Sequence, residues 1–140
     1  MNTPFNNNNT TSGFLSNNFD YKNLANEFCD YYYTTYDNSL SDLSDMYKYD
    51  SIFTYLGTDL KGFLKYKNRI EKFYEITKFS HTINEIISQP LNKKTILITV
   101  TGTVRINNDT NDNKFHETIT LQKDNDDNYH IHNTIFNLLE

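Results

Sequence analysis

A carboxylate on a predicted strand is the residue of this chain with the clearest capacity for chemistry. Glu85 and Glu117 are the only acidic residues within the predicted strands, and Glu117 shares a strand face with Phe115 and Ile119, because side chains alternate between the two faces. A carboxyl group in an apolar interior has a raised pKa and can act as a general base. Glu117 beside Tyr32 would serve as that base if the chain were an enzyme.

The histidines and the single cysteine form no recognisable metal or nucleophile motif. The four histidines are His81, His116, His130 and His132. His130 and His132 share a strand face, but a catalytic zinc site needs a third ligand, and pairing across a subunit interface is the simpler role. Cys29 lies among apolar neighbours, which predicts a small buried hydrophobe. The sequence has no glycine-rich phosphate loop, nucleophile elbow or Cys-x-x-Cys pair, so we expect no cofactor and no metal.

Length and charge restrict the class of protein. The chain has 140 residues, about one domain, and a net charge of −5, which repels phosphate backbones and argues against a direct nucleic-acid partner. Five basic residues are expected to form a solvated helix face, namely Lys61, Lys65, Lys67, Arg69 and Lys72. The Asn-rich residues 1–18 predict a disordered tail before a domain at 19–140. We expect a soluble, intracellular protein without a secretory signal or a membrane partner.

The first half of the chain has the spacing of helices. After Asp20, a candidate N-cap, Leu24, Phe28 and Tyr32 recur every four residues, which predicts a helix of about five turns. A short second helix is expected at 40–47, a strand at 51–56 before Gly57, a short strand or turn around residue 60, and a third helix after Gly62.

The second half has the alternation of strands. They are predicted at 79–87, ending before Pro90, at 94–107 with a bulge or bend at Gly102, at 115–123 and at 129–138. In the last strand, alternation would place Ile131, Asn133 and Ile135 on one face and His132, Thr134 and Phe136 on the other. We therefore predict an α+β domain whose curved antiparallel sheet wraps the first helix around a conical cavity. Its expected lining is Phe28, Tyr32, Met46, Phe73 and Phe136.

The order of these residues resembles the nuclear transport factor 2 family. The matching features are Phe28, the Tyr32-Tyr33 pair, Asp37, Ser51 to Gly57, Gly62, Phe79 to Ile83, Phe115 and His132 to Phe136. They span the chain from about Phe19 to Leu138, and they are also similar to the dimerisation module of the Ras-GAP-binding stress-granule scaffold proteins. The resemblance implies a cone-shaped fold with helices first, and a homodimer joined through the back of the sheet. The candidates for that face are Thr99, Thr101, Thr103, His116, Thr118, Thr120, His130 and His132.

The resemblance implies three kinds of binding site. The transport factor carries Ran-GDP by inserting a Ran aromatic ring into the cone, beside an acidic rim. The acidic position on the first strand is Leu56 here, which argues against Ran, although Asp109 and Asp112 remain candidate rim residues. The transport factor also grips Phe-Gly repeats beside an aromatic residue that corresponds to Tyr55. The scaffold modules hold Phe-containing peptides in a groove that corresponds to Leu24, Phe28, Met46 and Phe136, which are otherwise simply core residues.

These inferences favour a non-enzymatic, homodimeric binding module for Phe-containing peptides or Phe-Gly nucleoporins. We expect it in the cytoplasm and nucleus, including the nuclear pore. The alternatives are a Ran-GDP import carrier, a scaffold-type peptide-binding module and an enzyme that uses the cone cavity, like the isomerases and dehydratases that the same cone-shaped fold also houses.

Overall fold

The computed structural model describes residues 20–74, 78–107 and 109–139. The elements are α1 (Tyr21–Asn38), the 3₁₀ helix η1 (Leu40–Met46), β1 (Tyr47–Tyr55), β2 (Thr58–Lys61), α2 (Phe63–Tyr74), β3 (Phe79–Asn92), β4 (Thr95–Ile106), β5 (Asn113–Lys123) and β6 (Tyr129–Leu139). This order confirms the predicted helices and strands. The predicted disordered tail, residues 1–18, lies outside the described residues. Within those residues, neither helix is long and apolar enough to span a bilayer.

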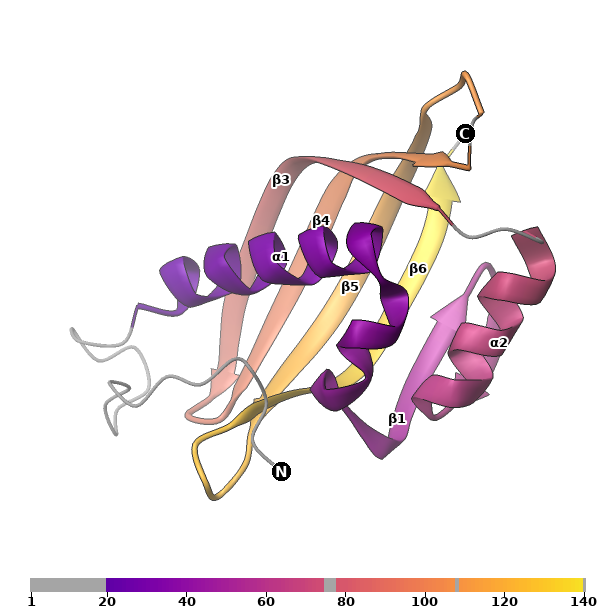
Figure 1. Ribbon diagram of the computed structural model, residues 1–140. Coiled ribbons are helices and arrows are strands. Elements are labelled where there is room, and N and C mark those ends of the chain that lie inside the picture. The colour runs from indigo at the N-terminus through magenta and orange to yellow at the C-terminus, as the bar shows by residue number, and fades with distance from the viewer. Residues whose placement is uncertain (1–19, 75–77, 108, 140) are drawn as a thin grey trace.

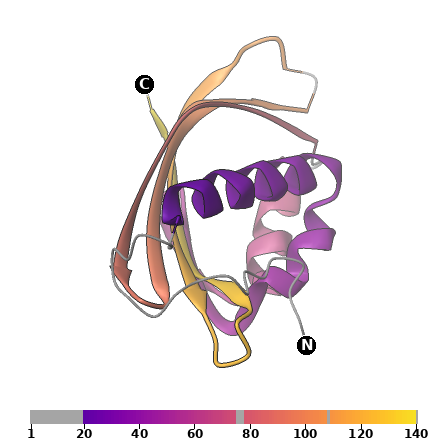
Figure 2. The same cartoon turned by 90° about the vertical axis from the view of Figure 1, so that its left-hand side faces the viewer.

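The helix α1 begins at the predicted cap and lies across the concave face of the sheet (Figure 1). The Asp20 carboxylate accepts a hydrogen bond from the backbone N–H of Asn23 at 2.9 Å, which satisfies one of the free donors at the helix start. One stripe of α1 is buried, including Leu24, Phe28 and Tyr32. The sheet bows around this stripe (Figure 2), so the predicted cone is confirmed.

The six strands form one sheet in the order β2-β1-β6-β5-β4-β3. All neighbours are antiparallel except β1 and β6, which are parallel, with Tyr55 opposite Phe136. The predicted antiparallel arrangement is confirmed for β3 to β6, and the pairing of β1 with β6 adds one parallel neighbour that was not predicted. The cause is non-local: the last strand returns to lie beside the first, in the same direction, and no hairpin connects the two.

Register shifts interrupt the strand pairing, and one of them lies opposite Gly102. Opposite Gly102, β3 contains an extra residue between Ile83 and Glu85, and a Cβ on Gly102 would lie 2.2 Å from the backbone oxygen of Thr82. The bend at Gly102 is therefore confirmed, and the close approach of the backbones explains why glycine is needed there.

A second register shift between β5 and β6 changes which residues of β6 face inward. The predicted alternation holds from Asn133 to Phe136 but is wrong at Ile131 and His132: Ile131 is buried together with Thr134 and Phe136, whereas Ile135 is 46% exposed and His132 is exposed. The bulge inserts one residue, His132, into β6. Ile131 on one side of the bulge therefore faces inward together with Thr134 on the other side, which a regular strand would not allow.

The strand β3 does not end before Pro90 but continues to Asn92. Pro90 pairs with Ile96 just before a register shift. Because β3 is an edge strand, a proline without an N–H donor can be accommodated there.

Candidate functional site

Aromatic rings line the interior of the cone. They come from the helices α1 and α2 and from strands β1, β3, β5 and β6. Phe136 stacks on Tyr55 with ring centroids 5.0 Å apart and on Phe115 at 5.6 Å. The cavity between these rings is small. The centre of a water molecule can lie within only about 10 Å³ of it, which is room for about one water. Its walls come mainly from five rings, those of Tyr36, Tyr55, Tyr66, Phe79 and Phe136.

Glu117 contributes a carboxylate to this aromatic cavity. It is 2% exposed, so the prediction that it points inward is confirmed. Its Oε1 accepts a hydrogen bond from the hydroxyl of Tyr33 at 2.8 Å, rather than from Tyr32 as expected. Burial raises the pKa of Glu117 to about 7, and the hydrogen bond from Tyr33 opposes that rise. Glu117 is thus a buried acid that titrates near neutrality.

Other polar groups of the interior include several phenols and one thiol. The hydroxyls of Tyr36 and Tyr66 lie 2.6 Å apart, and the Tyr47 hydroxyl donates to that of Tyr32 at 3.2 Å. Burial, and then the charge of Glu117, raises the pKa of Cys29 to about 12. The thiol is thus protonated near neutral pH, as the sequence predicted for a buried, unreactive cysteine.

A histidine–aspartate pair joins the end of α1 to β3. The Nδ1 of His81 lies 2.6 Å from Oδ1 of Asp37, and the backbone N–H of His81 donates to Oδ2 at 2.8 Å. The side chain of His81 is 3% exposed and that of Asp37 is 23% exposed. Sequence reasoning missed this pair, because its members lie 44 residues apart and Asp37 resembled an ordinary helix-ending residue.

The candidates for a Ran-facing rim are Leu56, Asp109 and Asp112. Leu56 and Gly57 form the turn between β1 and β2, with φ angles of +50° and +85°, and the backbone N–H of Leu56 donates to the carbonyl of Phe136 at 3.1 Å. Asp112 forms an ion pair with Arg105 at 3.0 Å. Asp109 is exposed. Of the two acidic candidates, one is therefore already paired with a cation of its own chain.

The candidate peptide groove is closed in this structure. Four residues of the groove, Leu24, Phe28, Met46 and Phe136, are each at most 7% exposed, and the candidate platform Tyr55 is 3% exposed. The structure does bring Tyr55 and Phe136 together in one stack. These residues serve as core here, and their contact with a peptide stays a prediction.

The outer face of the sheet carries a row of two threonines between two exposed isoleucines. Because Val100, Glu117 and Phe136 point inward, their strand neighbours point outward. The register aligns Ile87, Thr99, Thr118 and Ile135 across β3 to β6. Ile87 is 56% exposed and Ile135 is 46% exposed, and Ile52, opposite Asn133, is 48% exposed.

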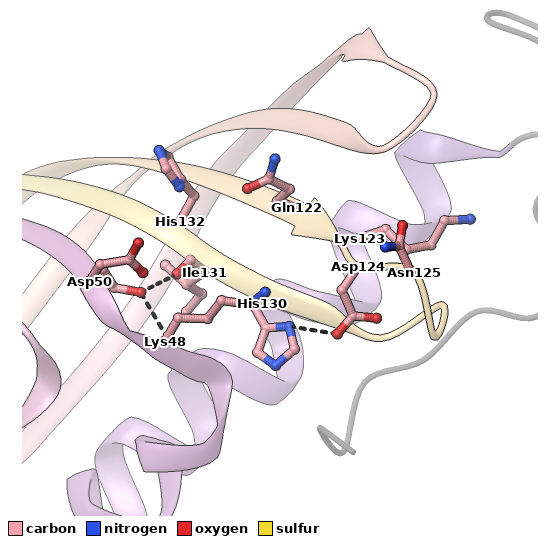
Figure 3. Close-up of a pocket in the computed structure, with 10 residues that line it drawn as sticks. Lys48, Asp50, Gln122, Lys123, Asp124, Asn125, His130, Ile131 and His132 are labelled. Atoms are coloured by element: carbon pink, nitrogen blue, oxygen red, sulfur yellow. Dashed lines mark hydrogen bonds and ion pairs between the residues drawn. The ribbon is translucent and has the colours of Figure 1, made fainter. Parts of the chain in front are cut away.

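A polar pocket of about 240 Å³ lies at the other end of the sheet, beside the bulge in β6. Figure 3 shows His130 directed at Asp124, with Lys48 and Asp50 of β1 nearby. The Nδ1 of His130 lies 3.4 Å from Asp124. Burial, followed by the charge of Lys48, lowers the pKa of His130. Within the described residues, no three His, Cys, Asp or Glu side chains gather as metal ligands.

Comparisons with known proteins agree with this architecture. Residues 24–138 match the model of the nuclear transport factor 2 (NTF2) domain. Nuclear transport factor 2 of Candida albicans is 30% identical over 122 residues, which cover 85% of this chain and 95% of that protein.

Two solved structures share the fold. Nuclear transport factor 2 from Cryptosporidium parvum superposes with a TM-score of 0.71 at 24% identity, covering 84% of this chain and 94% of that one. The yeast Ubp3-associated protein Bre5 superposes with a TM-score of 0.71 at 18% identity, covering 87% and 98%. The domain match, the relative and the cone together show that this chain belongs to the nuclear transport factor 2 family.

Proposed function

We propose that this protein is a homodimeric, non-enzymatic binding module for Phe-containing segments such as Phe-Gly repeats, and that it works in transport between cytoplasm and nucleus. Family membership supports the transport role, since the relatives are named nuclear transport factors. The structural observation that carries the proposal is the row on the outer face of the sheet that has exposed isoleucines at both ends, with the exposed Ile52 nearby.

That row fits a second copy of the chain. Ile87 and Ile135 lie at its two ends, and the threonines between them are partly buried. Single exposed hydrophobic residues are common, but three isoleucines on one face of a sheet, Ile52, Ile87 and Ile135, favour an interface. A two-fold axis through the row would bring the same residues of both copies together, as a closed dimer requires.

The interior supports binding rather than catalysis. A general base must lie within hydrogen-bonding reach of a substrate proton. The cavity beside Glu117 has room for about one water, which is too little for an organic substrate.

The Phe-binding contacts remain proposals. We place them at the Tyr55–Phe136 stack and at the adjoining Leu24, Phe28 and Met46. Because these side chains are buried, a peptide ring has to separate them first, and that opening lowers the apparent affinity.

The rim gives little support to a Ran-GDP carrier. Leu56 offers no charge to a basic partner, and Asp112 is already paired with Arg105. Asp109 is exposed, and its Oδ1 accepts a hydrogen bond from the backbone N–H of Asn111 at 3.3 Å. We therefore expect binding to Ran-GDP to be weaker than binding to Phe-containing peptides.

Light scattering on the full chain tests the dimer. We expect a mass of about 33 kDa, twice the 16.6 kDa of one chain. The double variant Ile87→Asp, Ile135→Asp should be monomeric. Leu64→Asp, on the outside of α2 and 69% exposed, is the matched control and should remain dimeric. A monomeric wild-type protein would refute this part of the proposal.

Nuclear magnetic resonance titration tests the ligand. A Phe-Gly peptide should shift the resonances of β1 and β6, a Ser-Gly peptide should not, and Tyr55→Leu should weaken the effect. Ran-GDP forms a third arm of the titration. Tighter binding of Ran-GDP than of Phe-Gly peptide would favour the import-carrier alternative, and equal responses to the two peptides would refute ring recognition.

A further inference from the structure

We propose that the outer edge of β3 binds an extended segment of a partner protein, which adds to the sheet as a further strand. The pairing is centred on the backbone of Ile86 and Ser88, and the partner segment carries a basic residue beside Glu85. The groups that form the bonds belong to the backbone at the border of the sheet, so this site goes beyond the function proposed above.

The strand β3 is one of the two border strands of the sheet (Figure 1). It has 14 residues, whereas β2 at the other border has 4. A border strand has a row of N–H and C=O groups that no neighbouring strand satisfies. Another extended segment offers acceptors and donors at the same alternating spacing. The edge of β3 is therefore a template for one more strand.

Two hydrogen bonds show which way the backbone of β3 points before its bulge. The carbonyl of Lys78 accepts from the N–H of Asn107 at 2.6 Å, so the even residues up to 82 bond to β4. The N–H of His81 instead donates to the carboxylate of Asp37 at 2.8 Å. In an antiparallel pair these two directions alternate from one residue to the next, so the odd residues of this part of β3 point outward.

The bulge reverses that alternation in the middle of β3. The N–H of Lys123 donates to the carbonyl of Lys94 at 2.7 Å, so the even residues of β4 bond to β5 and its odd residues bond to β3. After the bulge, odd residues of β4 lie opposite odd residues of β3, as Thr99 does opposite Ile87. The residues whose backbone groups point outward here are therefore Ile86, Ser88 and Pro90.

Both ends of this edge are closed to pairing. Asp37 occupies the N–H of His81, and Pro90 has no N–H to donate. Between them, the N–H groups of Ile86 and Ser88 point away from β4, and no described strand lies beyond β3. Each of these two residues can exchange two hydrogen bonds with an antiparallel strand, about four in all. The closed ends limit strand addition to this short window and fix its register.

Charge favours a partner segment over a second copy of β3. Glu85 is exposed beside the window, and no ion pair within the described residues includes it. An added strand places a side chain next to Glu85 on the same face of the sheet, where an opposite charge stabilises the pairing. Residues 79–92 contain no lysine or arginine, so a second β3 cannot provide that charge. The occupant is a partner segment with a basic residue among β-branched ones.

Hydrogen exchange on the full-length protein tests the geometry of the edge before any ligand is added. The amides of Ile86 and Ser88 should exchange about tenfold faster or more than that of Ile87, which bonds to β4. Similar protection of all three amides would overturn the proposal, because the edge would already be covered. Protection that rises with protein concentration would identify a second copy as the occupant and would equally overturn it.

The binding probe is a seven-residue peptide of alternating threonine and valine with lysine at its centre. When it occupies about nine tenths of the protein, exchange of the Ile86 and Ser88 amides should slow by about tenfold. A matched peptide with a central glutamate should bind about threefold more weakly, and Glu85→Lys should reverse this preference. A lysine peptide methylated on alternate backbone nitrogens cannot pair and should not bind.

Two variants at one position separate backbone pairing from loss of a side chain. Ser88→Ala keeps the N–H and should bind the lysine peptide as the wild type does. Ser88→Pro removes an outward N–H, leaves the bonds to β4 in place and should weaken binding by about fivefold or more. Equal binding by these two variants, equal binding of the methylated peptide, or no protection by the lysine peptide would overturn the proposal. If Ser88→Pro does not fold, the methylated peptide applies the same test to the wild-type protein.

Discussion

Replacing Glu117 with glutamine should change how the stability of this protein depends on pH. Glutamine has nearly the same shape and keeps an oxygen that can accept the hydrogen bond from Tyr33, so the substitution removes mainly the ionisation. The structure gives both the sign and the size of the expected effect, because burial raises the pKa of Glu117 from 4.5 to about 7.

The sign follows from which state holds the proton. Below pH 4.5, Glu117 is protonated in the folded and the unfolded chain. Between pH 4.5 and about 7 the unfolded chain loses this proton while the folded chain keeps it, so the free energy of unfolding falls as pH rises. Above pH 7 the loss is complete, and it amounts to about 3 kcal/mol, from a difference of about 2.5 pH units at 1.36 kcal/mol each.

Urea denaturation of both proteins from pH 4.5 to 8, at one fixed protein concentration, measures this effect. The free energy of unfolding of Glu117→Gln minus that of the wild type should rise by about 3 kcal/mol across this range and then level off, since other titrating groups cancel in the difference. The urea midpoints should separate by about 1 M or more. A constant cost of burying the glutamine amide shifts the whole difference curve but leaves its slope unchanged. A difference that is flat with pH would refute the assignment of Glu117 as a buried acid with a raised pKa.

Three further substitutions test the backbone and the helix anchor by chemical denaturation. Gly102→Ala should destabilise the protein by about 3 kcal/mol or more, because the new Cβ would lie 2.2 Å from the Thr82 oxygen; a loss under 1 kcal/mol would show that the strands separate easily. Gly57→Ala meets no atom within 4 Å but has a φ of +85°, so only the conformational cost of about 1 kcal/mol is expected. Asp37→Ala should cost about 2–3 kcal/mol by leaving His81 buried without its partner, and Asp37→Asn should recover part of that loss; equal stability of all three proteins would contradict an anchoring role.

The elements of this fold were predictable from local patterns, whereas their irregularities were not. The four-residue spacing of Leu24, Phe28 and Tyr32 predicted α1 because only one face of a helix can be buried against a sheet. The bulge at His132 was missed because an inserted residue leaves no mark in the alternation until the pairing strand is known. The parallel pairing of β1 with β6 joins residues about 80 positions apart, and no local signal encodes such a contact.

In the candidate site, too, local patterns predicted some features and packing decided the others. The inward direction of Glu117 followed from its spacing to Phe115 and Ile119, a property of one strand. Its hydrogen-bond donor did not, because Tyr32 and Tyr33 are neighbours on α1, both are buried, and only the packing of helix on sheet decides which hydroxyl reaches the carboxylate. The pairing of His81 with Asp37 also depends on that packing.

The position of negative charge within the cone leads to a last inference about specificity. The family resemblance implies a cone whose rim is acidic, yet here the first-strand rim position is Leu56 and Asp112 is neutralised by Arg105. The acidic group lies inside instead, at Glu117, where its interaction with a cation is less screened by water and salt. A basic partner group at the rim would therefore gain little, and Glu117 cannot supply the missing charge because it is buried beside a cavity with room for about one water. Discrimination among partners of the cone should depend on apolar and aromatic contacts more than on the number of basic residues in the partner.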